Sequence, residues 1–366
     1  MTLGATVLVS FGATFALSLA LPLVVKPLLV RLGIMDVPNE RSSHERPVLR
    51  GLGLAVLVAI VAVEGALTSV SAMLQPDGWE WRFLLVITLG SLFAGLLGLG
   101  EDLRGVSVRV RSAILVAIAL SAAVSLIALA RDAFGGASFG WWATGAGWQL
   151  GWIAALPLWA LALLAVYGLL FISSYINVAN FMDGLNGISG LHGVIAGLAF
   201  AAAGFFTMGG GWLMIAGLVL AGGFAGFLPW NLTKPGAFMG DVGSYLLGGA
   251  VAVTSFAAFV SGVPVLATIG PMVVYFGDVG FTLVKRVRAG HRWDEPHKEH
   301  VYQRLQQLGM PHLAASGINA GFTVATSALG LVSIFVNPAW WWLLLALGLA
   351  LVVLYQFTPR LLHSRS

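Results

Sequence analysis

The sequence predicts an all-α polytopic transmembrane helix bundle, with about eleven helices and ten as the alternative count. Hydrophobic residues make up 58% of the 366 positions. Charged residues make up only 9%, against about 25% in soluble domains. The apolar residues also form runs of roughly 20, the length that crosses a bilayer as a helix. A water-soluble fold is therefore excluded, and the lack of cysteine excludes a disulfide framework.

The runs define eleven helices in a single integral-membrane domain that covers residues 1–366. The first run has no basic segment before it and is too long for a signal peptide, so we expect a retained helix. The helices are expected at about residues 4–30, 51–74, 82–100, 112–130, 152–176, 187–208, 211–230, 244–261, 264–284, 313–336 and 339–358.

Basic residues set the predicted orientation. Of the 19 Lys and Arg residues, all but Arg82 and Arg131 fall in the odd-numbered junctions between helices or in the C-terminal tail. Cytoplasmic loops carry such an excess of positive charge. We therefore expect the N-terminus outside and the C-terminus inside. The net charge of +4 is explained by this distribution, and we expect no nucleic-acid partner.

Acidic residues concentrate on the same predicted face, although topology does not require it, because Asp and Glu contribute little to orientation. Five polar loops that mix acids, bases and histidines on one face predict a functional site there. They lie at about residues 31–50, 101–111, 177–187, 231–244 and 285–311.

The first loop contains Asp36, Arg41 and His44, and prolines at 38 and 47 stiffen it. Arginine and histidine suit a phosphate-bearing ligand. The alternative is a basic loop whose only role is to fix the topology.

The second loop has two adjacent carboxylates, Glu101 and Asp102, at the end of an apolar helix. A bound Mg²⁺ would relieve their repulsion, because this ion takes one or two carboxylates together with substrate phosphate oxygens. The alternative is a solvated helix end paired with Arg104.

The third loop contains Asn177, Asn180, Asp183 and Asn186 but no basic residue, so topology cannot explain it. Asp183 has no cation nearby in the sequence, which implies a metal ion or a partner from another loop. The asparagines suit a sugar or a metal-bound water. The alternative is an Asn-Gly turn with Asp183 as a helix cap.

The fourth loop contains Asp241 between two glycines, followed by Ser244 at the predicted start of the next helix. Glycines let backbone N–H groups approach an anion, and the start of a helix favours negative charge. The alternative is a capped helix start.

The fifth loop contains Asp294, His297, His300 and Arg304. A zinc site of Asp294 and the two histidines is one interpretation. Two histidines spaced three apart beside Lys298 and Arg304 fit a diphosphate better. The alternative is a solvated amphipathic helix.

Taken together, the five loops resemble the polyprenyl-phosphate N-acetylhexosamine-1-phosphate transferases, the glycosyltransferase family 4 type. The resemblance covers about residues 30 to 305, and the motifs occur in the family's order. They are D-x-P-x-x-R-x-x-H from Asp36 to His44, the paired acids, N-x-x-N-x-x-D-G-x-x-G from Asn177 to Gly187, G-D-x-G-S from Gly240 to Ser244, and the final histidine loop.

Three positions depart from the family pattern. The first member of the paired acids is Glu101, and Asn186 stands where the family has a second acid. In the last loop only His300 matches the histidine cluster of the lipid I and common-antigen branches. The strings around His44 and His300 resemble the branch that starts O-antigen or exopolysaccharide units, and a lipid I synthase is the alternative.

The resemblance implies transfer of N-acetylhexosamine-1-phosphate from a UDP-N-acetylhexosamine, either GlcNAc or a 6-deoxy sugar, to undecaprenyl phosphate, with release of UMP. It implies a multi-pass enzyme of the bacterial inner membrane that uses Mg²⁺ or, alternatively, Mn²⁺. Membrane lipid and a second copy of the chain are further candidate partners.

The resemblance also implies roles for the loop residues. Asp102 and Asp183 are expected to bind the metal, with Glu101 and Asp241 as further candidates. Asp36 would orient or deprotonate the lipid phosphate, and His300 completes the expected catalytic set. The expected substrate-binding residues are Arg41, His44, Asn177, Asn180, Asn186, Asp241, Ser244, His297 and Arg304.

Two rival classes remain at this point. A secondary transporter should place ionisable groups near the bilayer midplane. Here Glu64 and Asp278 are the only acidic residues within the predicted helices. A non-catalytic scaffold would leave Asp183 unexplained.

Overall fold

The computed structural model describes residues 3–36, 48–134, 152–207, 209–233, 236–292 and 297–363. Within these ranges, eleven helices are long and apolar enough to cross a membrane, which confirms the predicted multi-pass membrane protein. They are α1–α3 (Leu3–Arg31, through the π-helix Leu8–Ala13), α4 (Gly53–Leu74), α5 (Glu80–Arg104), α6 (Val108–Phe134), α7 (Leu158–Met182), α8 (Ile188–Phe206), α9 (Gly211–Leu232), α10 (Gly240–Val260), α11–α12 (Val265–Arg288), α14 (His312–Val332) and α15 (Trp341–His363).

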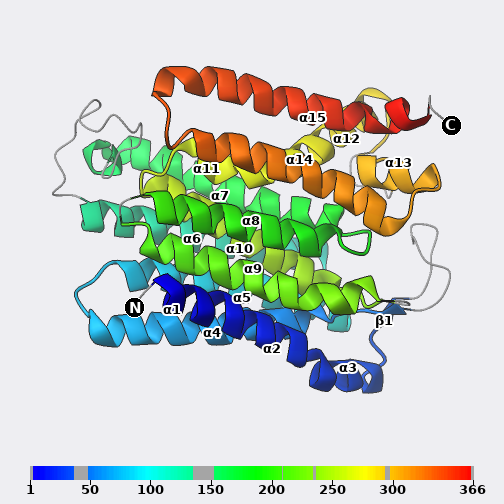
Figure 1. Ribbon diagram of the computed structural model, residues 1–366, viewed down its shortest axis with the longest axis horizontal. Coiled ribbons are helices and arrows are strands. Elements are labelled where there is room, and N and C mark those ends of the chain that lie inside the picture. Colours follow the sequence, from blue (N-terminus) through cyan, green and yellow to red (C-terminus); the bar gives the residue numbers. More distant parts are fainter. Residues whose placement is uncertain are drawn as a thin grey trace.

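The long helices run side by side, and the two ends of the chain lie at opposite ends of the bundle (Figure 1). An odd number of spans requires this arrangement. The end that carries the C-terminus also carries α3 (Pro22–Arg31), β1 (Met35–Asp36) and the short helix α13 (Val301–Gln307). The start of α5 and the end of α6 are joined by the ion pair between Arg82 and Asp132.

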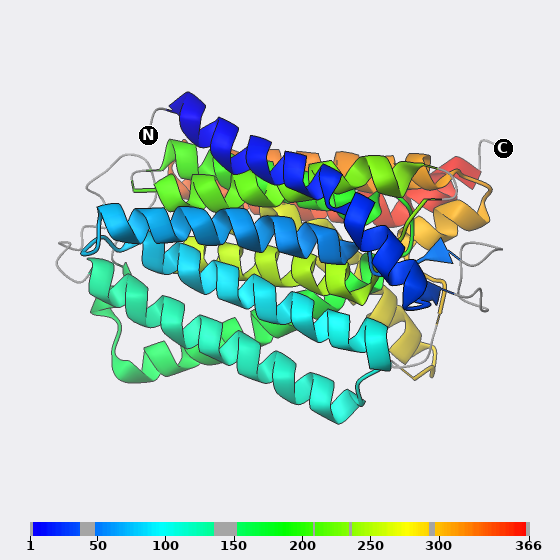
Figure 2. The same cartoon turned by 90° about the horizontal axis from the view of Figure 1, so that it is seen from below.

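Helix α10 lies at the centre of the bundle, with nearly all its side chains buried, and it packs against α4, α5 and α7 (Figure 2). Its glycines make this possible: a Cβ at Gly248 would collide with the backbone of Ile176, and one at Gly249 with the Cβ of Ala94. Small residues allow such close approach between membrane helices. The packing brings the first turn of α10 beside the last turns of α5 and α7.

Several helices extend further than the apolar runs predict. Helix α5 continues to Arg104, α7 continues to Met182, and α10 begins at Gly240. The predicted boundaries were wrong because apolarity marks the hydrocarbon layer, whereas a helix continues until its backbone groups lose their partners. As a result Glu101, Asp102, Asn177, Asn180, Asp241 and Ser244 lie on helix ends and not in loops.

A short antiparallel β-pair, absent from the all-α prediction, closes the first loop. Met35 pairs with Leu49, and Asp36 pairs with Val48. The Phe238 N–H donates to the carbonyl of Leu49 at 2.9 Å, so the fourth loop runs beside this pair. The pair returns the chain to the bundle just before Arg50.

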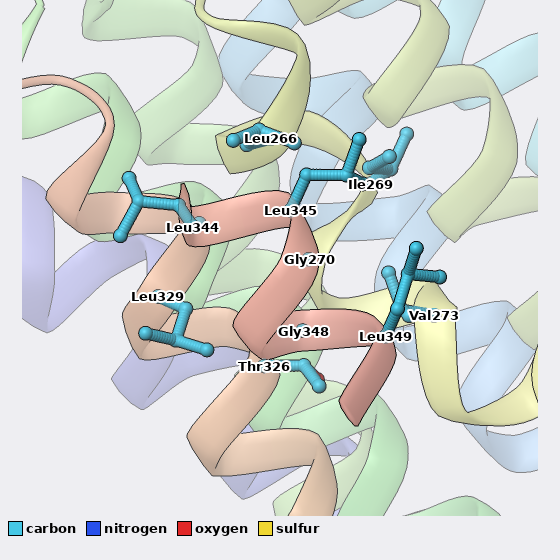
Figure 3. A pocket seen from close by; sticks show the side chains of 11 residues that line it. Leu266, Ile269, Gly270, Val273, Thr326, Leu329, Leu344, Leu345, Gly348 and Leu349 are labelled. Atoms are coloured by element: carbon cyan, nitrogen blue, oxygen red, sulfur yellow. The ribbon is translucent and has the colours of Figure 1, made fainter. Parts of the chain in front are cut away.

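The helix that contains Asp278 is interrupted near Gly270 and Pro271, where a 3₁₀ turn (Gly270–Met272) joins α11 (Val265–Ile269) to α12 (Val273–Arg288). The break, α14 and α15 enclose a cavity of about 30 Å³ (Figure 3). Thr326 is the one polar side chain in its lining. The space suits a water or two at most, so it cannot hold a nucleotide sugar.

Candidate active site

Arg50 joins three of the five predicted loops at one end of the bundle. Its Nε lies 2.8 Å from Oδ1 of Asp102 on α5, and its second terminal nitrogen lies 2.5 Å from Oδ2 of Asp241 on α10. One guanidinium therefore faces two carboxylates that are remote in sequence. In the sequence Arg50 is one basic residue among several in the first loop, and only the packing of the helices places it between the two acids.

Asp102 anchors the start of α10. Its two carboxylate oxygens accept the backbone N–H groups of Asp241 and Val242 at 3.0 and 2.9 Å, and its side chain is only 1% exposed. Gly240 has φ +72°, and a Cβ there would collide with the Asp102 carboxylate. The first N–H groups of α10 therefore bind a carboxylate of the same chain.

Asn180 connects the third and fourth loops. Its side-chain amide donates to Oδ1 of Asp241 at 2.8 Å and lies 3.0 Å from Oγ of Ser244. The amide thus orients Asp241 from the side opposite Arg50. Three residues that the sequence predicted for substrate binding are brought together here.

Asp183 follows the last turn of α7 and is the least compensated acid of the site. Its Oδ1 accepts a hydrogen bond from Ser189 Oγ at 2.7 Å, and among the described residues it forms no ion pair. Burial raises the pKa of Asp183 to about 7, and the charges of Asp241 and Asp102 add to this. The Ser189 hydrogen bond and Arg50 act in the opposite direction. A bound cation would therefore stabilise the ionised form strongly.

The remainder of the third loop is tied to neighbouring elements by its backbone. Gly187 donates its N–H to Oδ1 of Asn231, whose amide donates to the carbonyl of Ala237 at 2.9 Å. Ser316 of α14 donates to the carbonyl of Asn186 at 2.9 Å. The Oδ1 atom of Asn186 is buried and has no hydrogen-bond partner in the described structure. The sequence analysis did not single out Asn231, an amide in the last turn of an apolar helix.

Helix α13 brings the fifth loop onto the third. Tyr302 donates its hydroxyl proton to the carbonyl of Phe181 at 3.1 Å, and its ring covers Gly184, where a Cβ would clash. Burial, with the nearby charges of Asp278 and Asp183, raises the pKa of Tyr302 well above its usual value. The neutral hydroxyl is therefore a permanent donor.

The two histidines of the fifth loop lie together, with ring centroids 4.9 Å apart. Burial first, and then the charges of His300 and Arg286, lower the pKa of His297 to about 4. His297 is accordingly neutral at pH 7 and can offer a substrate phosphate only one N–H. His300 is buried, and its Nδ1 lies 3.2 Å from Oδ1 of Asp278.

Other predicted residues stand apart from this cluster. Asn177 donates to the Ser173 carbonyl of its own helix at 2.8 Å. Glu101 accepts the Val106 N–H at 3.0 Å and a bond from Arg111 at 3.4 Å, so it stabilises the turn after α5. Arg304 lies on α13 and is partly exposed. For Asp36 the structure describes the backbone pairing alone, and Arg41, His44 and Asp294 fall outside the described residues.

The chemistry of the donor set fits magnesium. In the part of the chain that the structure describes, no three His, Asp or Glu side chains form a preformed metal cluster. Asp183 and Asp241 nevertheless offer carboxylate oxygens at the same end, and Asp183 forms no ion pair within the described ranges. Mg²⁺ keeps several waters and needs only one or two carboxylates beside substrate phosphates. All of these donors are oxygens, which disfavours zinc.

Comparison with known proteins supports the motif-based resemblance. A family profile described as glycosyl transferase family 4 matches residues 84–259. The chain is 26% identical to a probable undecaprenyl-phosphate N-acetylglucosaminyl 1-phosphate transferase of Bacillus subtilis, over 96% of this chain and 90% of that one.

Two further relatives cover less of the chain. A decaprenyl-phosphate N-acetylglucosaminephosphotransferase of Mycobacterium tuberculosis is 28% identical over 79% of this chain and 72% of its own length. A phospho-N-acetylmuramoyl-pentapeptide-transferase of Desulforudis audaxviator is 29% identical over 73% and 83%. These matches agree with the motifs, and the chain is similar to proteins of glycosyl transferase family 4.

Proposed function

We propose that the chain transfers N-acetylhexosamine-1-phosphate from a UDP-N-acetylhexosamine to undecaprenyl phosphate and releases UMP. One observation carries the proposal: acids from separate helices meet at one end of the bundle, and Asp183 among them forms no ion pair with any residue that the structure describes. The names of the relatives, which act on undecaprenyl or decaprenyl phosphate, support the same acceptor class.

The bonds that change define what the residues must do. A phosphate oxygen of the lipid attacks the sugar-bearing phosphorus, the diphosphate bond breaks, and UMP leaves with the electron pair on its oxygen. The attacking phosphate monoester has a second pKa of about 6, so it is largely ionised at pH 7. A strong general base is not required, and positioning and charge neutralisation should dominate.

Asp183 and Asp241 would hold Mg²⁺, with Mn²⁺ as the alternative, and the ion would neutralise charge on the nucleotide diphosphate. Asp102 would act indirectly, because its oxygens already bind the start of α10 and Arg50. Asn180 would keep Asp241 oriented. The buried Oδ1 of Asn186 would accept a donor group from the sugar.

The remaining predicted residues would bind the phosphates. Arg41, His44 and Arg304 would supply cationic or N–H donors, His300 would contact the substrate beside them, and Asp36 would orient the lipid phosphate. These roles rest on the family motifs and on the position of α13 against the third loop. We further propose that the reaction is the first membrane step of O-antigen or another envelope polysaccharide, at the cytoplasmic face of a bacterial inner membrane.

The test is turnover of the purified protein with undecaprenyl phosphate and a panel of UDP-N-acetylhexosamines, including GlcNAc and 6-deoxy sugars. We expect UMP release with at least one sugar, loss of activity with EDTA and recovery with Mg²⁺. Asp183→Asn should lower kcat by about 100-fold or more, the range seen when one charge-stabilising group is removed.

Asp77→Asn is the matched control, because it also removes one carboxylate but lies exposed at the opposite end of the bundle. Its activity should equal that of the wild type. Full activity of Asp183→Asn would refute the metal assignment, and no product with any UDP-sugar would refute the function.

A further inference from the structure

Asp278 is a buried carboxylate that the proposed transfer does not use directly. It lies on α12 and is 0% exposed, although it belongs to a membrane-spanning segment. An ionisable group in such a place is costly unless it is well bonded. Its neighbours show what it does.

Four donors from three elements converge on this carboxylate. Oδ1 lies 3.2 Å from Nδ1 of His300 and accepts from Thr282 at 3.3 Å, while Oδ2 accepts the Tyr355 hydroxyl at 3.3 Å. The backbone N–H of Val301 donates to both oxygens, at 3.2 and 3.1 Å. Tyr355 is in turn held by the amide of Asn319 at 3.0 Å.

The contact with His300 determines which ring nitrogen carries the proton. Because Thr282, the Val301 N–H and Tyr355 all donate to the Asp278 oxygens, the carboxyl group acts as the acceptor here, and Nδ1 of His300 is the donor. In the neutral imidazole the other nitrogen, Nε2, then carries a lone pair. A carboxylate behind a histidine fixes tautomer and ring orientation in the same way at metal sites.

The same carboxylate also secures the short helix that carries His300. Val301 begins α13, and the next residue, Tyr302, donates to Phe181 at 3.1 Å beside Gly184. Asp278 therefore positions His300 directly, and through α13 it also positions the third loop. The ring of His300 lies parallel to that of Tyr302, with centroids 5.9 Å apart.

We propose that Asp278 is a positioning residue that keeps His300 in the Nδ1-protonated tautomer and so leaves Nε2 as the atom available to the substrate. The part of this inference that concerns contact between Nε2 and the substrate rests on the proposed function. The tautomer itself follows from the contacts of Asp278.

Asp278→Asn is the decisive variant, because an amide of the same shape can donate to Nδ1 and reverse the tautomer. We expect kcat to fall about 100-fold, the upper range for partners behind a ligating histidine, with KM changed little. The double variant Asp278→Asn/His300→Gln should be no slower than His300→Gln alone, because residues that act as a unit are not additive.

Nitrogen-15 NMR of histidine-labelled protein provides a readout that does not need activity. Spectra in alkaline buffer should show His300, assigned by its loss in His300→Gln, with the proton on Nδ1. In Asp278→Asn the proton should move to Nε2. Tyr355→Phe removes another donor from the same carboxylate, and it should leave both the tautomer and kcat within about threefold of the wild type.

An Nε2-protonated His300 in the wild type would overturn the inference, as would additive losses in the double variant. The wild-type spectrum decides even if Asp278→Asn fails to fold. Lack of turnover with every UDP-sugar would refute the proposed function instead, and the tautomer measurement would still stand.

Discussion

At the scale of single residues, charge balance at the site depends on Arg50. It lies between Asp102 and Asp241 and is about one third exposed, so water screens it only in part. Removing it would leave two acids facing each other in a partly buried space.

We expect Arg50→Gln to lower the free energy of unfolding by about 1–3 kcal/mol, the cost of leaving a buried polar partner unsatisfied. Its kcat should also fall, because Asp241 loses its orientation. Thermal unfolding in detergent and UMP release measure the two effects. Arg109→Gln, an exposed arginine at the same end, serves as the control. If Arg50→Gln and Arg109→Gln had the same unfolding free energy and the same kcat, the role of Arg50 as a bridge between Asp102 and Asp241 would be contradicted.

At the scale of secondary-structure elements, the close crossing of α5 and α10 places the carboxylates. Gly98, one turn before Asp102, lies against the carbonyl group of Asp241, and a Cβ there would overlap the Asp241 backbone. Gly53 meets Gly243 in the same way on the α4 side. These contacts bring the first turn of α10 within reach of Asp102.

Gly98→Ala should therefore push α10 away from α5, at a cost of about 1–3 kcal/mol for overpacking, and reduce activity. Gly100→Ala is the matched control on the same helix, because its Cβ would meet only the Val106 side chain at 3.7 Å. That change should stabilise α5 by about 0.5–1 kcal/mol. If the unfolding temperatures of Gly98→Ala and Gly100→Ala shifted in the same direction, the close crossing of α5 and α10 at Gly98 would be contradicted.

At the scale of the whole molecule, eleven spans place the termini at opposite ends and the five motif loops at one end (Figure 1). The distribution of Lys and Arg predicts that this end faces the cytoplasm. Cytoplasmic UDP-sugars could then reach the site without crossing the bilayer.

The orientation can be tested directly, because the chain has no cysteine of its own. In intact spheroplasts, a membrane-impermeant maleimide should label Asp77→Cys, in the exposed loop between α4 and α5. Arg109→Cys, exposed at the start of α6, should be labelled only after permeabilisation. The opposite pattern would place the site on the outer face.

The amino-acid sequence by itself determined the membrane spans, the end at which the motifs gather and the family resemblance. These follow from local properties, namely apolar length, charge distribution and motif spacing. It did not determine where helices stop, because polar residues such as Asp102 and Asn180 continue a helix once packing supplies partners for them.

Only the tertiary structure decided how the site residues are paired. Arg50 and Asp241 are 191 positions apart, and Asp278 and His300 are 22 apart across two elements. Such contacts depend on how each helix is rotated and how closely it approaches its neighbours, which the glycines of α5 and α10 set. That rotation is a property of the packed bundle, and no local pattern records it.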